Sequence, residues 1–183
     1  MRYKEYNINK VLEKSIVLFW QKGYNGCSIN EIVQVTGVNR YSLYHEFKNK
    51  EGILDASLNL YRERYCDNKL SLLQPGESLF ETLKKFYMSF LEKNTPTSGC
   101  YFIHIGTELA DTNETIKNSL NDYLNEIQSL FSKLLIEYKF TIKDAELKAR
   151  HLLGLYCTAM SLGLIHTSEE RNQYVTNGLN LIL

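Results

Sequence analysis

The chain has 183 residues, of which 44% are hydrophobic and 23% are charged. This composition is ordinary for a globular protein, and the length is sufficient for one large or two small domains with real hydrophobic cores. The formal net charge is zero, which argues against a protein that binds any polyanion indiscriminately.

The zero net charge hides an uneven distribution along the chain. Residues 1–50 hold eight Lys and Arg against four acidic residues, whereas the remaining residues hold 13 against 17. This split indicates a basic N-terminal part that is suited to phosphates and a more acidic remainder that is not.

The first 50 residues predict three helices. From Ile8 the apolar residues recur every three or four positions, which is typical of a helix with one buried face. That helix ends at KGYNG, and the capping box Ser28-Ile-Asn-Glu31 begins a second helix. Thr36-Gly37 ends the second helix, and Asn39 is a good N-cap for RYSLYHEF. Two short helices joined by a tight turn, behind a longer first helix, form the helix-turn-helix pattern.

The rest of the chain also predicts helices, because Gly and Pro are sparse. A fourth helix begins after Asn49 and runs towards Leu73. The later helices are predicted at 79–91, 100–110, 116–138, 141–166 and 172–183. The fold class is therefore all-α with about nine helices and no convincing strand. We expect a helix-turn-helix domain at residues 1–48 and a larger helical domain at residues 49–183.

The third helix, residues 40–47, divides its aromatic residues between two faces. On a helical wheel Leu43 and Phe47 fall on one side, whereas Tyr41 and His45 point nearly opposite. The first pair is expected to hold the helix to its domain and the second pair to be exposed. A helix of eight residues is about 12 Å long, which is short enough to lie in a DNA major groove.

The N-terminal motifs resemble those of the TetR/AcrR-type transcriptional regulators. These motifs read SINEIVQVTGV, NRYSLYHEF and KNKEGIL, and the resemblance runs from Ile8 to about Leu54 without a gap. The joint spacing of Gly37, Leu43-Tyr44, Phe47 and Lys50-Glu51 is highly specific. The later segment SGCYFIHIGTELA is similar to the sixth helix of some members, which is a much weaker match.

The resemblance implies a DNA contact for eight residues: Ser28, Asn30, Arg40, Tyr41, Ser42, Tyr44, His45 and Lys50. Arg40, Tyr41 and Ser42 match base-reading positions, and an arginine there can make a bidentate contact with guanine. Tyr44 and His45 match positions that touch phosphate, and Lys50 matches a lysine that grips the DNA backbone. Tyr41 stands where the family often has a small residue, and Glu46 is acidic beside DNA, so both depart from the pattern.

The resemblance also implies that the larger domain encloses a ligand cavity. Its candidate lining residues are Tyr87, Phe90, Tyr101, His104, Glu108, Tyr156 and Met160. The alternative is that these residues are ordinary core, since aromatic residues and Met at helical spacing are usually buried packing residues and a core His is often satisfied by a neighbour.

The last two predicted helices are expected to form a two-fold dimer interface, as the resemblance implies. The candidate interface residues are Leu153, Tyr156, Met160, Leu164, Leu179 and Ile182. The chain also ends on the apolar segment LNLIL, and such a segment is normally covered by other protein surface. Packing within one subunit is the alternative.

The four cysteines, Cys27, Cys66, Cys100 and Cys157, lie far apart without a CxxC pair, so neither a metal site nor a disulfide framework is predicted. Thiol-based sensing by Cys100 or Cys157 is one interpretation. Inert burial is favoured, because no Lys or Arg is adjacent to Cys100 and Cys157 lies in an apolar run.

Two further absences bear on function. No nucleophile-base pair, phosphate loop or metal-ligand spacing occurs, so we expect neither an enzyme nor a cofactor. The charged segment MRYKEYNINK lacks the apolar run of a signal peptide, and the apolar stretch 152–165 is too short to span a bilayer. We therefore expect a cytoplasmic location and no membrane partner.

The sequence thus favours a homodimeric transcriptional regulator that binds a double-stranded DNA operator, a repressor released by a small-molecule effector. The alternative is a DNA-tethered structural or division-control protein whose C-terminal domain binds a protein partner.

Overall fold

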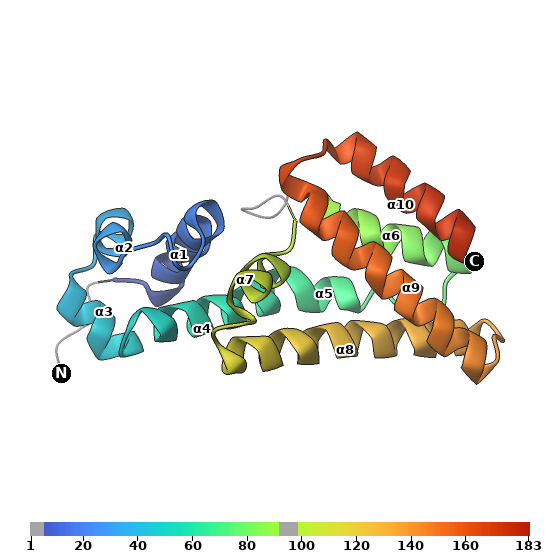
Figure 1. Cartoon of the computed structure of the whole chain (residues 1–183), viewed down its shortest axis with the longest axis horizontal. Helices are drawn as coiled ribbons and strands as arrows, with labels where there is room; N and C mark the ends of the chain where they lie inside the picture. The colour runs from blue at the N-terminus through green and yellow to red at the C-terminus, as the bar shows by residue number, and fades with distance from the viewer. Residues whose placement is uncertain (1–5, 92–98) are drawn as a thin grey trace. The chain divides into compact units, whose positions relative to one another are not determined.

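The computed structural model describes residues 6–91 and 99–183, without the side chain of Leu164. Within these residues the chain is all helical and forms no strand, so the predicted fold class is confirmed (Figure 1). The helices are α1 (Ile8–Lys22), α2 (Ile29–Thr36), α3 (Arg40–Phe47), α4 (Lys50–Tyr61), α5 (Asp67–Leu70), α6 (Leu79–Leu91), α7 (Tyr101–Leu109), α8 (Glu114–Glu137), α9 (Ile142–Ser161) and α10 (Ser168–Ile182).

Two irregular helical turns change the predicted segmentation. The π-helical turn η1 (Arg62–Cys66) interrupts the predicted fourth helix and separates α4 from the four-residue α5. The 3₁₀ turn η2 (Leu162–Leu164) follows α9 at Ser161, before the predicted end near residue 166. None of the described helices combines the length and the apolar composition that crossing a bilayer requires.

The described residues cluster into two compact units, Met1–Tyr65 and Cys66–Leu183. The domain boundary predicted from the sequence lies after residue 48, so the fourth helix is expected in the larger domain. In the structure α4 packs against α1 and α3 and contributes Ile53 and Leu54 as fully buried side chains. The division therefore differs from the expectation, because α4 completes the core of the first unit.

The first unit is built from helices that begin and end where the sequence placed their signals. Ser28 and Glu31 form a capping box at the start of α2, which ends at Gly37 with a left-handed φ of 74°. Ile16, Phe19 and other apolar residues of α1 are fully buried. The turn at Gly37 redirects the chain within two residues, so α3 begins close to α2.

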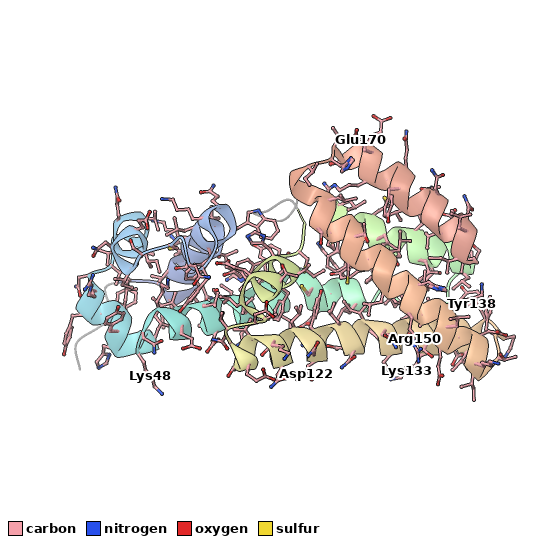
Figure 2. All side chains as sticks on the ribbon, in the orientation of Figure 1. Lys48, Asp122, Lys133, Tyr138, Arg150 and Glu170 are labelled. Atoms are coloured by element: carbon pink, nitrogen blue, oxygen red, sulfur yellow. The ribbon has the colours of Figure 1, made fainter. Side chains whose placement is uncertain are left out.

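The second unit has a core of aromatic side chains. Tyr87 stacks on Phe131 with ring centroids 6.1 Å apart, and Phe90 meets Tyr156 edge to face at 5.3 Å. Figure 1 shows α10 lying beside α6 and α9, in agreement with their packing contacts. Figure 2 labels Tyr138 at the turn between α8 and α9. There its hydroxyl donates to the carbonyl of Gly76 at 2.9 Å, which ties the loop before α6 to this end of the unit.

Gly52 provides a test of how α3 and α4 are joined. A Cβ at this position would lie 1.9 Å from the carbonyl oxygen of Phe47, so the backbone itself would have to move. We expect Gly52→Ala to lower the free energy of unfolding by about 1–3 kcal/mol, the usual cost of overpacking, in a urea titration. Tyr41→Ala is the control, because the Tyr41 side chain is 80% exposed. Equal stability of the two variants would contradict the close approach.

Candidate nucleic-acid interface

The two faces of α3 have opposite environments. Leu43 is fully buried and Phe47 is nearly so, whereas Tyr41 is 80% exposed and Tyr44 is 37% exposed. His45 is also exposed, and its ring stacks on that of Tyr41 with centroids 6.3 Å apart. The exposed face is therefore a preformed polar and aromatic surface, and its two rings support each other.

The start of α3 is fixed by contacts from elsewhere in the unit. Asn39 caps the helix by accepting a hydrogen bond from the backbone N–H of Ser42 at 2.9 Å. The hydroxyl of Tyr6 donates to the carbonyl of Ser42 at 3.3 Å. Sequence reasoning missed Tyr6, because the two residues lie 36 positions apart and nothing in the local pattern connects them.

Arg40 and Asn30 are brought together at the exposed surface. The guanidinium Nη2 of Arg40 donates to Oδ1 of Asn30 at 2.8 Å. An arginine has five N–H donors in a fixed fork, so one hydrogen bond to α2 orients the group and leaves donors for another acceptor. The pair places a cation of fixed direction at the N-terminal end of α3, and the base-reading role of Arg40 stays a prediction.

The hydroxyl of Ser28 forms hydrogen bonds with Glu31 of the same helix start. Its hydroxyl donates to Oε2 of Glu31 at 2.8 Å and accepts from the Glu31 backbone N–H at 3.3 Å. Glu31 also forms an ion pair with Lys22. Lys22 and then Ser28 lower the pKa of the Glu31 carboxyl to about 2. The Ser28 hydroxyl therefore serves the capping box, and its DNA contact stays a prediction.

The ammonium group of Lys50 points into the first unit. Its Nζ donates to the carbonyl oxygens of Tyr24 at 2.9 Å and of Cys27 at 2.8 Å, and it lies 4.0 Å from the centroid of the Tyr24 ring. Two of the three N–H donors of Lys50 thus hold the loop between α1 and α2. A grip on the DNA backbone stays a prediction, and the observed role is structural.

The candidate pocket residues of the second unit fall into two groups. Tyr87, Phe90, Tyr101, Tyr156 and Met160 are buried, whereas His104 and Glu108 on α7 are partly exposed. The rings of Tyr87, Phe90 and Tyr156 pack against one another. These contacts match the core interpretation of the aromatic residues, and their role in ligand binding stays a prediction.

Three of the predicted interface residues are corrected by their burial. Tyr156, Met160 and Leu179 lie in the core of their own unit, so they are not available to a partner. Leu153 and Ile182 are half-buried, and the side chain of Leu164 lies outside the described residues. Helical spacing identified the apolar faces of α9 and α10 but could not tell an inward face from an outward one.

Other apolar residues of α9 and α10 are exposed instead. They are Ile142 and Leu147 of α9 and Tyr174 and Leu181 of α10, and together with the exposed Leu183 that follows α10 we call them the apolar surface. Leu181 is 89% exposed and Leu147 is 53% exposed.

Among the described residues no group of three or more His, Cys, Asp or Glu side chains could hold a metal ion.

The comparison with protein families matches residues 11–57 to the bacterial regulatory proteins, tetR family. The chain is 33% identical over 124 residues to the HTH-type transcriptional repressor ComR of Escherichia coli, and the aligned part covers 65% of this chain and 59% of ComR. It is 26% identical over 133 residues to IcaR of Staphylococcus epidermidis, a negative transcriptional regulator of the biofilm operon icaADBC. That alignment covers 71% of this chain and 68% of IcaR.

Solved structures show the same fold over nearly the whole chain. A cysteine mutant of the TetR family regulator CifR, complexed with a 26bp double-strand operator DNA, matches with a TM-score of 0.84 and 19% identity over 98% of each chain. SCO4454 of Streptomyces coelicolor, a TetR-family transcriptional regulator, matches with a TM-score of 0.83 and 17% identity. That match covers 94% of this chain and 92% of SCO4454.

Lys50 allows the structural and the DNA-gripping roles to be separated. We expect Lys50→Ala to lower the free energy of unfolding by about 1–3 kcal/mol in a urea titration, because two loop carbonyls lose a charged donor. Lys14→Ala is the control, since Lys14 is exposed on α1. Unchanged stability, together with a salt dependence of DNA binding that falls by about one phosphate contact, would restore the DNA-gripping role instead.

Proposed function

We propose that this chain, whose residues 11–57 match the tetR family of bacterial regulatory proteins and whose fold matches that of a TetR family regulator, represses transcription by binding an operator in double-stranded DNA as a homodimer. The observation that carries this proposal is the exposed face of α3, on which Arg40 is oriented by Asn30 at 2.8 Å. Arg40 is in the first turn of α3, and the first turn of a recognition helix contacts base edges when the helix lies in the major groove.

The geometry of α3 suits a major groove. Eight residues make a helix about 12 Å long, and Leu43 and Phe47 fasten it from one side only. The opposite side presents Arg40, Tyr41 and His45, which can reach bases and phosphates while the buried side keeps the helix in register. Phosphate contacts fix the position of such a helix, and base contacts give it sequence preference.

The charge distribution supports the same use of the first unit. Residues 1–50 carry four more basic than acidic residues, and the rest of the chain carries four more acidic than basic ones. A local surplus of positive charge attracts phosphates, whereas an acidic remainder keeps the second unit away from them. The proposed interface therefore lies on the part of the chain with the favourable charge.

The partner of the apolar surface is a second copy of the chain in this proposal. An exposed set of Leu, Ile and Tyr side chains on two adjacent helices is costly in water unless it is covered. A two-fold axis through this surface uses the same residues from both subunits. Such a dimer would carry two copies of α3, one for each half of a two-fold symmetric operator.

Release from the operator would follow from a small-molecule effector of the second unit. An effector can shift the dimer only as far as its affinities for the bound and the released states differ. The candidate residues are the half-exposed His104 and Glu108 beside the buried aromatic core. A protein partner on the apolar surface would instead favour the structural or division-control alternative.

Arg40 provides the test of base reading. The operator is first identified by a binding selection from genomic fragments. We expect Arg40→Ala to weaken binding to this operator by about 1–3 kcal/mol. Binding to random DNA should change much less, because one bidentate base contact is lost. Lys14→Ala is the matched control, since it also removes one positive charge and Lys14 is exposed on α1 outside the proposed DNA-contacting residues. Equal losses on operator and random DNA would contradict the base-reading role, and failure of the unaltered protein to bind any fragment at low salt would contradict the function.

The apolar surface provides the test of the dimer. We expect Leu181→Glu to give monomers in analytical ultracentrifugation, because the interface would then bury an unpaired charge. Ile136→Glu is the control, since Ile136 is an exposed apolar residue of α8 outside this surface. The two proteins are compared at concentrations where the unaltered protein is a dimer. If Leu181→Glu is also a dimer there, the assigned interface is wrong.

A further inference from the structure

The core of the second unit contains a cluster of four thiol and hydroxyl groups that the proposed function does not use. Its members are Cys66 at the end of η1, Cys100 before α7, Tyr123 on α8 and Tyr156 on α9, and all four side chains are buried. The two tyrosine hydroxyls lie 2.9 Å apart and share a hydrogen bond. The Cys100 sulfur interacts with the side chains of both Cys66 and Tyr156, so the cluster is continuous.

The surroundings of Cys100 favour a thiolate. Burial alone would raise the pKa of this thiol, but the Cys66 side chain, the backbone N–H groups of Ile103 and Phe102 and the Tyr156 hydroxyl outweigh it and lower the pKa to about 7. The two N–H groups belong to the first turn of α7, where unsatisfied donors and the helix dipole stabilise negative charge.

Two other members of the cluster, Cys66 and Tyr123, stay protonated at neutral pH. The interaction with Cys100, and then burial, raise the pKa of Cys66 well above its ordinary value, although Tyr123 and Lys69 act in the opposite direction. Burial raises the pKa of Tyr123 as well. The cluster therefore pairs one ionisable nucleophile with a neighbouring thiol that retains its proton.

We propose that Cys100 is a modification site for small, uncharged hydroperoxides, and that Cys66 converts the product into an intramolecular disulfide. The uncharged character and small size of the oxidant follow from the burial of both sulfurs, which would exclude a bulky or ionic reagent. As a means of regulation this inference rests on the proposed operator binding, whereas the thiol chemistry can be observed without DNA.

The reaction has two balanced steps. The Cys100 thiolate attacks one oxygen of the hydroperoxide, the O–O bond breaks, and the products are Cys100 sulfenic acid and an alcohol or water after protonation by solvent. The Cys66 sulfur then attacks the sulfenic sulfur, the S–O bond breaks, and hydroxide leaves with the Cys66 proton as water. Two thiols thus lose two electrons to one hydroperoxide.

The place of Cys66 in the chain connects this chemistry to the first unit. Cys66 is the last residue of η1 and the first residue of the second unit, and Arg64 of the same turn forms an ion pair with Glu13 of α1. A disulfide is only about 2.05 Å long, so its formation draws the end of η1 towards the start of α7. Wide π-helical turns are uncommon and often occur at functional positions.

The first experiment treats the reduced full-length protein with hydrogen peroxide at neutral pH and maps the products by peptide mass spectrometry. We expect a Cys66–Cys100 disulfide that dithiothreitol reverses. Cys66→Ser should stop at a sulfenic acid on Cys100, which dimedone traps when the oxidised protein is unfolded in its presence, and Cys100→Ser should give neither product. Cys157→Ser is the control and should behave like the unaltered protein.

Cys157 makes the test discriminating, because it is more exposed than Cys100 but burial raises the pKa of its thiol to about 11. Oxidation of the unaltered protein by hydrogen peroxide from about pH 5 to about pH 9 should level off for Cys100 above its pKa and keep rising for Cys157. This measurement needs no variant. Earlier oxidation of Cys157, or equal pH profiles of the two thiols, would overturn the proposal.

The second experiment measures operator binding by the reduced and the peroxide-treated protein. We expect oxidation to weaken binding by about 5- to 150-fold, the usual range of coupling between two sites, and to leave Cys100→Ser unaffected. A disulfide without any change in affinity would refute its regulatory role. If the reduced protein binds no DNA, the proposed function fails while the mass spectra still decide the thiol chemistry.

Discussion

The burial of Leu43 and Phe47 is the constraint on which the exposed face of α3 depends. An isolated helix of eight residues is not stable in water, so α3 exists because these two side chains are anchored in the core of the first unit. Helical geometry then obliges Tyr41 and His45 to face outward. The same anchoring that makes the helix stable therefore also decides which residues are exposed.

Two of the residues predicted to contact DNA also make contacts within the first unit. Lys50 holds the loop between α1 and α2 through the carbonyls of Tyr24 and Cys27, and the Ser28 hydroxyl is engaged with Glu31. Both residues occupy positions that the family pattern associates with DNA. Their observed contacts stabilise the elements next to α3, and their direct contacts with DNA stay predictions.

The second unit combines an aromatic core with a small polar centre. Phe86, Tyr87, Phe90 and Phe131 exclude water, and exclusion of water strengthens every hydrogen bond and partial charge around the buried thiols. Burial by itself raises the pKa of Cys100, and the hydrogen bonds from Cys66, from the backbone of α7 and from Tyr156 lower it to about 7 without a neighbouring cation in the sequence. This is also why a search for Lys or Arg beside each cysteine favoured inert burial: the stabilising groups come from η1, α7 and α9.

The sequence alone was sufficient for the all-α class, the caps of α2 and α3, and the division of α3 into two faces. These features depend on neighbours within about four positions, and helical periodicity reports such neighbours directly. It could not predict that α4 belongs to the first unit, that Tyr156 and Leu179 face their own core, or that Cys66 and Cys100 meet. Those facts depend on contacts between residues distant in the sequence, which only the packing of whole helices against one another decides.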